Sequence, residues 1–504
     1  MVKAVVGEEI QLKSVEDRLS HSRLSCQVGL AIGKISTSLD RGFVFDLVPT
    51  PLNDAGEVAS WIIESKDDNN NKKKGGSKSK TQSDSSSFLS IDKDWVAEHA
   101  RQVSRMLVGG MKVVGIYIWM NESLFKNSTL VLCQTVKGVA DAAPIRDIGW
   151  DERLLIHISY SPSRWTCRNC SLSSNITSSS LRPCDFKMGR VFSTLQKFRC
   201  IYSFDIRFPI FHESISNPKK FAGIVRDVIS SHAEELKGAK ALINGNLVNV
   251  DEQCSFDGVH EVEFFIPFMQ HTSFQAYSEE EVVGILVFTG SVCSYAYSNS
   301  KESISQALAD LKGDIISSLH SRLDIICDEA DGQLDSDSVA DVGGEVSTQT
   351  PIPHLQLQSL RKGCSLCFPR RVFVPWLGDT YICDYLQPSE TLEGVKDHCV
   401  ELMSMEALTD TSMVLEPEAE SATSMKFSTN SNSNSNSFWE TAMPVSPELR
   451  TLSLNNNSGD KGSVSGKQLE KSSSNDMTGP GSGSNVFFFF FSWCELVLFY
   501  CVII

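Results

Sequence analysis

Apolar residues recur along this chain at spacings that predict helices and strands separated by long polar stretches. Residues 99–109 place apolar side chains at helical spacing and end at a glycine pair, which predicts a helix that feeds into a following strand. Residues 113–119 form an unbroken apolar run rich in β-branched and aromatic side chains. Such a run predicts a strand buried on both faces. Residues 154–158 predict another strand, and His157 within it is interpreted as a core or edge histidine.

The second half of the chain continues this mixture of predicted strands and helices. We expect strands at 195–209, 371–376 and 380–386, two strands around Gly290 within 282–297, and helices at 230–242, 303–328 and 392–403. The helix at 303–328 is long and amphipathic, with apolar residues at steps of three and four, so its expected role is burial against a core. The fold class is therefore α/β or α+β, with a mixed sheet and flanking helices.

Polar stretches divide the chain into six expected segments. Acidic, serine-rich or asparagine-rich composition cannot bury enough apolar surface to fold, so we expect linkers wherever it dominates. The expected segments are a first domain at 1–165 with a disordered insert at 66–88, a continuation or second α/β domain at 166–328, an acidic linker at 329–353, a small α/β segment at 354–403 that packs on the body, a disordered tether at 404–485, and a terminal apolar segment at 486–504.

The terminal segment has the length and composition of a membrane anchor. Residues 486–504 contain only two plainly polar side chains, Ser492 and Glu495, and a helix of this length would rise about 28 Å, close to the hydrocarbon thickness of a bilayer. The predicted transmembrane helix makes the chain tail-anchored. An aberrant end, for example one translated from an unspliced segment, is the alternative. The residues expected to lie in the membrane include Val486, Phe487, Trp493, Leu496, Leu498 and Ile504.

Charge and composition exclude several function classes. A net charge of −16 argues against a general nucleic-acid binder, which would carry a basic face. The N-terminal residues lack the apolar region of a secretory signal, so the body is expected in the cytosol. The fifteen cysteines are then expected as reduced thiols, and the sequons at Asn127 and Asn175 as unmodified.

One group of cysteines has a partial resemblance to a metal site. Cys167, Cys170, Cys184 and Cys200 offer four thiolates, but only the first two have the short spacing of a zinc knuckle. Ordinary thiols are the competing and favoured interpretation. Cys364 and Cys367 form a second, isolated pair. No sequence motif indicates a cofactor or a catalytic nucleophile.

The strand at 113–119, Val-Val-Gly-Ile-Tyr-Ile-Trp, resembles the strand by which MPN-type deubiquitinases present two zinc-binding histidines. Ile118, Trp119 and Met120 stand where that strand would read His-Ser-His, and Ile118 and Met120 cannot bind zinc. Residues 26–51 resemble the opening hairpin of the same domain, in which the catalytic glutamate would fall at Cys26. The resemblance implies an MPN-like pseudoenzyme. A buried strand in some other α/β domain is the alternative interpretation of residues 113–119.

A wider resemblance covers about residues 1 to 402 and identifies the chain as similar to the olfactory-receptor-four-like (ODR-four) proteins in their plant form. It is carried by the strings MVKAVVGEE, VGLAIGKISTSLDRGFVFDLVPTP, DKDWVAEHARQVSRMLVGGMKVVGIYIW, RWTCRNCSLSSNITSSSLRPCDFKMGRV and PRRVFVPWLGDTYICDYLQPSETLE. The chain departs from the family at its phenylalanine-rich end, where a more regular apolar helix would be expected.

That resemblance implies a non-catalytic adaptor at the endoplasmic reticulum membrane, with its body facing the cytosol. The expected partners are a cysteine protease specific for the ubiquitin-fold modifier, membrane-receptor clients and the lipid bilayer. A metal-dependent isopeptidase that uses an unrecognised site is the alternative function. Metal content separates the two, because the adaptor hypothesis expects no stoichiometric zinc at residues 118 and 120 and no cofactor.

Overall fold

The structure, a computed structural model, describes residues 2–36, 39–64, 87–145, 151–172, 177, 180–211, 221–247, 258–266, 282–337, 366–387, 390–405, 411–418 and 421–427. All of them belong to one compact unit formed by residues 1–434. Residues 66–86 of the predicted insert, residues 428–485 of the predicted tether, the terminal segment 486–504, Asn175 and Cys364 lie outside the described residues. The tether expected at 404–485 is wrong in its first part, because residues 411–413 form a 3-10 turn and residues 421–427 a sheet strand, and residues 87–88 at the end of the predicted insert belong to a strand as well.

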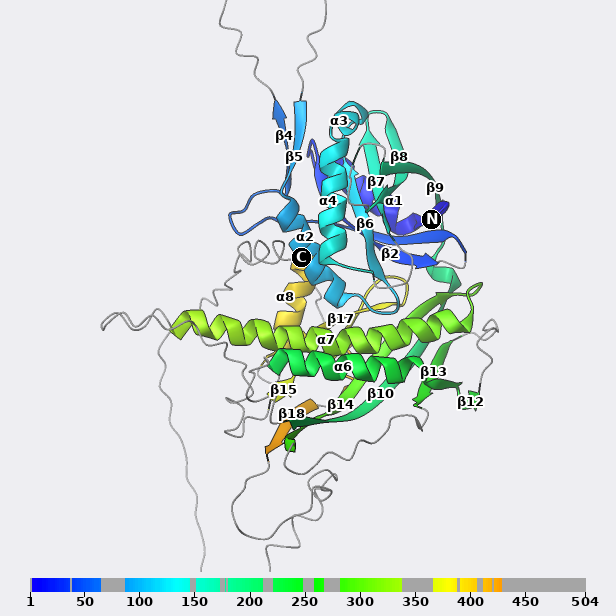
Figure 1. The fold of residues 1–504 in the computed structure, drawn as a ribbon. Coiled ribbons are helices and arrows are strands. Elements are labelled where there is room, and N and C mark those ends of the chain that lie inside the picture. The colour runs from blue at the N-terminus through cyan, green and yellow to red at the C-terminus, as the bar shows by residue number, and fades with distance from the viewer. Residues whose placement is uncertain are drawn as a thin grey trace, which may run out of the picture. The chain divides into compact units, whose positions relative to one another are not determined.

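The N-terminal part of the chain is a closed barrel of seven strands, coloured from blue through cyan to teal green in Figure 1. In spatial order its strands are β1 (Ala4–Glu8), β3 (Arg41–Pro49), β2 (Gln27–Ser36), β6 (Lys112–Trp119), β7 (Glu152–Tyr160), β8 (Ser163–Ser171) and β9 (Leu181–Gly189). β1 closes the barrel, because it pairs in parallel with β3 on one side and with β9 on the other.

Helices cover the barrel strands, which explains why several strands are apolar on both faces. Side chains of α1 (Glu9–His21) pack against one face, and those of α2 (Lys93–Met106) and α4 (Thr129–Ala142) pack against the other. α3 (Glu122–Asn127) follows β6 directly. The predicted helix at 99–109 thus begins earlier, at Lys93, where the Asp92 carboxylate accepts a hydrogen bond from the Trp95 N–H at 3.0 Å.

A two-stranded hairpin projects from the barrel at the top of Figure 1. It pairs β4 (Ser60–Glu64) with β5 (Ser87–Ile91). One face of the hairpin is buried against the barrel core through Leu89 and Ile91, which are 5% and 7% exposed. The other face carries exposed apolar side chains. They are Trp61, Ile63 and Phe88.

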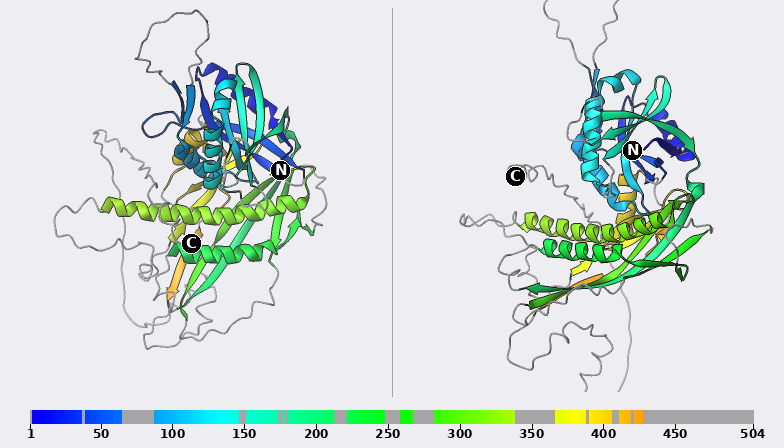
Figure 2. Two further views of the ribbon diagram at one scale, coloured as in Figure 1. Left: turned by 45° about the horizontal axis from the view of Figure 1, so that its top comes forward. Right: turned by 45° about the vertical axis from the view of Figure 1, so that its right-hand side comes forward.

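The middle of the chain forms a second, seven-stranded sheet with two helices on one face (Figure 2). Its strands in spatial order are β12 (Asn246–Leu247), β11 (Lys240–Ile243), β13 (Val259–Phe265), β10 (Leu195–Phe211), β14 (Val282–Asn299), β18 (Ser421–Phe427) and β15 (Leu366–Phe368). The helices α6 (Phe221–Lys237) and α7 (Ile304–Asp337) pack on it through one apolar cluster. A short 3-10 turn, η2 (Phe192–Thr194), connects the barrel to this sheet.

A smaller unit near the C-terminal end lies between the barrel helices and the second sheet. It consists of the hairpin β16 (Arg370–Pro375) and β17 (Tyr381–Leu386), the helix α8 (Leu392–Met403), and the turn η4 (Thr411–Met413). Its buried side chains belong to the same apolar cluster as those of α2, α4 and one face of β14. The small α/β segment expected at 354–403 therefore packs on the body in its described part.

Several predicted boundaries differ from the structure. The two strands expected around Gly290 are one continuous strand, β14, because β10 pairs with it from Leu195 to Phe211 without a break at the glycine. The boundary expected after residue 165 falls inside β8, since β8 and β9 are needed to close the barrel. The helix expected at 230–242 ends at Lys237, and residues 240–243 form β11 instead.

Residues 329–337, expected as the start of the acidic linker, belong to α7, and residues 338–353 lie outside the described residues. Among the described residues no helix combines the length and the apolar composition that a membrane-spanning segment needs.

Candidate functional site

The three positions where an MPN-type enzyme would carry its catalytic groups lie in the apolar core. Ile118 and Met120 are fully buried and Cys26 is 6% exposed. All three belong to one cluster with side chains of α2, α3 and α4. β2 and β6 pair antiparallel with Val28 opposite Ile118, so the start of β2, next to Cys26, lies beside the end of β6. Within the described part of the chain no group of three His, Cys, Asp or Glu side chains is placed to hold a metal ion.

His157 is a titratable side chain that lies beside Ile118 and Met120. It is the register partner of Ile118 on β7, and its ring stacks on Phe125 with 4.1 Å between ring centroids. Its Nε2 lies 3.1 Å from the Met120 carbonyl oxygen, so a neutral ring donates there. Burial lowers the pKa of His157, partly offset by that hydrogen bond and by Glu122, whose carboxylate is 3.7 Å from Nδ1. The strand pattern thus located a core histidine correctly.

Cys26 is buried in the apolar cluster that also contains Ile118 and Met120, whereas Trp119 belongs to the cluster on the other face of the barrel strands. Burial raises the pKa of the Cys26 thiol, although hydrogen bonds with Ser60 and Ser25 oppose the shift. Trp119 Nε1 donates to the Leu24 carbonyl at 3.3 Å, and the Trp119 ring lies 5.3 Å from that of Tyr160. The thiol therefore has the environment of a small apolar side chain rather than that of a nucleophile.

The four cysteines considered as a zinc site do not meet. Cys167 and Cys170 are three residues apart on β8, so they point to opposite faces of the strand and enter different apolar clusters. Cys167 faces Cys184 across β8 and β9, whereas Cys170 contacts Cys133 of α4. Cys200 lies on β10 in the second sheet. The four thiols of the less favoured zinc interpretation are therefore not brought together.

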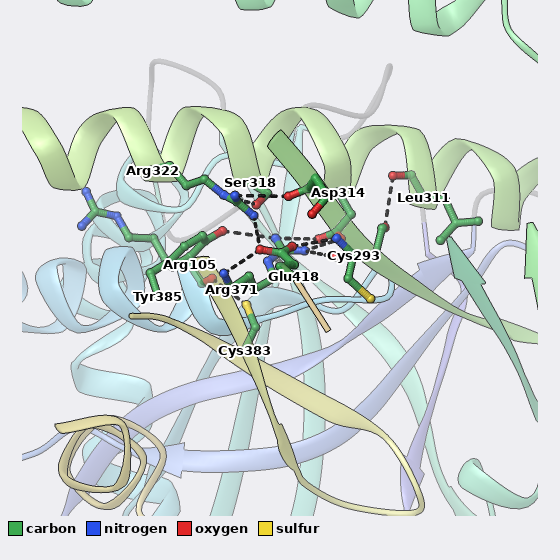
Figure 3. A network of polar contacts seen from close by, with 12 residues as sticks. Arg105, Cys293, Leu311, Asp314, Ser318, Arg322, Arg371, Cys383, Tyr385 and Glu418 are labelled. Atoms are coloured by element: carbon green, nitrogen blue, oxygen red, sulfur yellow. Dashed lines mark hydrogen bonds and ion pairs between the residues drawn. The ribbon is translucent and has the colours of Figure 1, made fainter. Parts of the chain in front are cut away.

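A buried cluster of charges, shown in Figure 3, was not predicted from the sequence. It comprises Asp314 and Arg322 on α7, Arg371 on β16, Tyr385 on β17, and Glu418 before β18, and we call it the charge cluster. The Glu418 carboxylate accepts hydrogen bonds from Arg322 Nη2 at 2.5 Å, the Arg371 backbone N–H at 2.7 Å and the Cys293 backbone N–H at 2.6 Å. One carboxylate thereby joins a helix, a strand of the second sheet and the small hairpin.

Arg371 provides the second centre of the charge cluster. Its Nη1 donates to Asp314 Oδ2 at 2.7 Å and to the Cys293 carbonyl at 3.2 Å, and its Nη2 donates to the Tyr385 hydroxyl at 3.2 Å. Burial opposes the charged form, but the Asp314 carboxylate together with Tyr385 and Cys383 holds the pKa of Arg371 above its usual range. The two arginines and two carboxylates are matched in charge, so the cluster has a structural rather than a reactive character.

A second ionic contact, which we call the Lys34 bridge, ties the barrel to α7. Lys34 on β2 is 3% exposed, and its Nζ lies 2.6 Å from Asp310 Oδ2, 2.8 Å from the Tyr297 carbonyl and 3.5 Å from Glu302 Oε2. Burial alone would lower the pKa of Lys34, but the two carboxylates raise it. In the sequence, a buried ionic contact was indicated by Lys34 alone, because it is the one charged residue in the largely apolar string VGLAIGKIS.

The glycine pair after α2 allows this close approach between barrel and second sheet. Gly109 has a φ of 72°, and a Cβ there would lie 2.0 Å from the Tyr297 ring. A Cβ at Gly110 would lie 2.5 Å from the Asp310 carboxylate. The Tyr297 N–H donates to the Gly109 carbonyl at 2.9 Å. The glycine pair that marks the helix end in the sequence also makes room for the second sheet.

Comparison with known proteins assigns the family. The family model described as ODR4-like, Odorant response abnormal 4-like, matches residues 29–414. The chain belongs to the ODR4-like family. The matched range contains the β2–β3 hairpin from Gly29 onward, the Lys34 bridge, and three of the four charged residues of the charge cluster.

Relatives of this ODR4-like chain come from animals and an amoeba. The chain is 25% identical over 352 residues to the odr-4 homolog of Xenopus tropicalis, covering 65% of this chain and 72% of that protein. It is 26% identical over 431 residues to the Dictyostelium discoideum odr-4 homolog, covering 83% and 81% respectively. The Homo sapiens odr-4 homolog is 25% identical over 347 residues, with 62% and 69% covered.

A solved structure of UfSP from C. elegans aligns with 81% of this chain and 59% of its own. The TM-score is 0.34 and the sequence identity is 8%. A TM-score of this size does not establish a common fold.

Proposed function

We propose that this ODR4-like chain is a non-catalytic adaptor, tethered to the endoplasmic reticulum membrane with its body in the cytosol. In this proposal it supports the folding or trafficking of membrane receptors and recruits a cysteine protease that removes a ubiquitin-fold modifier. The observation that carries the non-catalytic part is the apolar packing of Cys26, Ile118 and Met120. The resemblance to the ODR-four family supports the partner classes and the location.

The order of elements supports an MPN-like core for the barrel. The β2–β3 hairpin comes first, α2 follows, and β6 then pairs antiparallel with β2. In an active enzyme of that kind, zinc at the end of β6 would lower the pKa of a bound water and so generate hydroxide. The buried isoleucine and methionine offer no ligand for zinc, and the thiol of Cys26 cannot replace a carboxylate as general base while burial keeps it protonated.

Affinity purification of the tagged full-length chain from its native organism tests the adaptor proposal. Under mild conditions we expect to recover a cysteine protease specific for the ubiquitin-fold modifier, together with membrane-receptor clients. A variant with Trp61→Ser and Phe88→Ser, which removes exposed apolar area from the β4–β5 hairpin, tests whether that face takes part. Ile10→Ser is its control, because Ile10 is 72% exposed on α1. Recovery of other partners without any such protease would require a different client.

Two further measurements distinguish the adaptor from the isopeptidase alternative. Metal analysis of the purified chain should find less than one zinc per chain, and incubation with a ubiquitin-like conjugate should release no modifier. Chelator-sensitive cleavage by the purified chain would contradict the non-catalytic assignment. The same assay with recruited protease present serves as the positive control for the substrate.

Membrane attachment through residues 486–504 is tested by truncation. A chain that ends at Asn485 should leave the carbonate-resistant membrane fraction and become soluble. Its thermal transition should be unchanged, because the cut falls outside the unit formed by residues 1–434. Glu495→Leu in the full-length chain should strengthen insertion by about 2–3 kcal/mol, since a carboxylate near a helix centre is strongly unfavourable in a bilayer. A full-length chain that already fractionates as soluble would contradict the anchor.

A further inference from the structure

Two pairs of thiols join β8 to its neighbours. Cys167 on β8 is the direct register partner of Cys184 on β9, and the two side chains are hydrogen-bonded. Cys170, on the opposite face of β8, is hydrogen-bonded to Cys133 of α4. All four cysteines are free thiols. β8 therefore carries one thiol contact on each of its faces.

The first pair has the backbone geometry that a disulfide requires. Directly opposed residues on antiparallel strands have Cα atoms about 4.5–5.5 Å apart, whereas disulfides form at Cα separations of about 4.4–6.8 Å. Cys167 and Cys184 can therefore be bridged by side-chain rotation, with β8 and β9 left in place.

The two pairs differ in access to solvent. Cys167 is 3% exposed, and Cys133 and Cys170 are fully buried, whereas Cys184 is only partly buried. Hydrogen bonding from the Cys167 thiol lowers the pKa of Cys184, although burial and the Asp185 carboxylate oppose this. Cys184 thus combines partial access with a lowered pKa, and both properties favour reaction of a cysteine.

We propose that Cys184 and Cys167 form a redox-sensitive pair that peroxides convert to a disulfide between β8 and β9. The Cys184 thiolate attacks one peroxide oxygen, the O–O bond breaks, and hydroxide leaves, so that Cys184 becomes a sulfenic acid. Cys167 then loses its proton and attacks the Cys184 sulfur. The S–O bond breaks, and the departing hydroxide takes up the proton as water. In total two thiols are oxidised and one peroxide is reduced.

The disulfide would act on the closure of the barrel. β9 pairs with β1, and the chain leaves β9 through η2 toward the second sheet. A covalent link between β8 and β9 restrains the unfolded chain and so stabilises this closure. The inference does not depend on the adaptor proposal, because it concerns thiols distant in sequence from Ile118 and Met120. Reversible thiol oxidation of this kind is the form that disulfides take in reducing compartments.

Mass spectrometry of the full-length chain tests the pair. The reduced chain is treated with equimolar hydrogen peroxide, the remaining thiols are blocked with N-ethylmaleimide, and the chain is digested with trypsin and chymotrypsin. Both enzymes are needed, because trypsin does not cut between Arg182 and Pro183 and leaves Cys170 and Cys184 on one peptide. We expect the peptides of Cys167 and Cys184 to appear linked, with the loss of two hydrogens, before any Cys133–Cys170 link.

Matched variants complete the experiment. Cys184→Ser should abolish the link, whereas Cys170→Ser should retain it. Peroxide should raise the melting temperature of the wild-type chain by a few degrees, a reductant should reverse the change, and Cys184→Ser should not respond. The proposal is overturned if Cys133 and Cys170 link first, or if Cys184 proceeds to sulfinic acid while Cys167 stays a free thiol.

Discussion

The end of β6 and the charge cluster are both buried, but the first is filled by apolar side chains and the second by paired charges. At the end of β6, Ile118 and Met120 pack among the helices of the barrel. In the charge cluster, Arg322 and Glu418 are fully desolvated and bonded to each other. Among the described residues, the charge cluster thus lies where separate elements are joined, whereas the positions of Ile118 and Met120 at the end of β6 are filled by apolar packing.

The difference has a physical reason. Taking charges out of water costs several kcal/mol per ion, so a buried charge persists only when each of its donors or acceptors finds a partner. Glu418 has three such partners from three elements, and this requirement specifies how α7, β14 and β16 meet. An apolar cluster imposes no comparable condition on its neighbours. The end of β6 should therefore tolerate apolar exchange more readily than the charge cluster tolerates the loss of one charge.

The largest expected effect follows from removing Glu418. Glu418→Ala leaves the Arg322 guanidinium buried without its carboxylate, together with two backbone N–H groups without their acceptor. We expect a loss of about 3–5 kcal/mol in the free energy of unfolding, measured by chemical denaturation. Glu418→Gln retains an acceptor and should lose less.

Glu416→Ala is the matched control for this prediction. Glu416 pairs with Arg370 at 2.7 Å, but the two side chains are 35% and 30% exposed. Such a pair contributes about 0–1 kcal/mol. Equal losses in the free energy of unfolding for Glu416→Ala and Glu418→Ala would contradict the prediction that the charge cluster stabilises the contact between α7, β14 and β16.

A smaller loss is expected from introducing a metal ligand at the end of β6. Ile118→His would bury an imidazole without a partner, and we expect a loss of about 1–3 kcal/mol in the free energy of unfolding. The variant should gain no hydrolase activity, because a single histidine does not make a zinc site. Ile63→His on the exposed face of β4 is the control and should change stability little. Stoichiometric zinc binding by Ile118→His would contradict this prediction and would show that the added imidazole recruits His157 and Glu122, which lie beside residue 118.

The comparison also separates what the sequence could predict from what it could not. β6 and β7 could be predicted, because an unbroken apolar run indicates a buried strand without knowledge of the neighbouring strands. The single strand β14 was not, because Gly290 reads as a break until its pairing with β10 is known. The charge cluster could not be predicted, since Asp314, Arg371 and Glu418 are far apart in the chain and each has the local appearance of a surface charge. The spacing of the cysteines left a zinc site open beside the favoured interpretation as ordinary thiols, because it does not report which face of β8 each one occupies.

The smallest expected effect distinguishes two histidines that lie near the two regions. Burial lowers the pKa of His157, beside Met120, from its ordinary 6.5. A hydrogen bond to Asp384 raises the pKa of His398 on α8, although burial opposes the shift. Asp384 lies on β17 next to Tyr385 of the charge cluster, and its Oδ2 is 2.8 Å from His398 Nδ1. The two imidazoles should therefore give stability contributions with opposite dependence on pH.

The signs follow from which state binds the proton more tightly. His157 is protonated more readily in the unfolded chain, so its contribution is lost as pH falls below 6.5. His398 is protonated more readily in the folded chain, so its contribution is present below 6.5 and is lost as pH rises through its folded pKa. We expect the stability difference between wild type and His157→Gln to grow with pH, and that between wild type and His398→Gln to shrink. Both are measured by chemical denaturation between about pH 5 and pH 8, where histidine titrates. Asp384→Asn should remove most of the pH dependence that His398 contributes to stability and leave the contribution of His157 unchanged. Equal slopes of stability against pH for the two histidines would contradict the opposite directions of their pKa shifts.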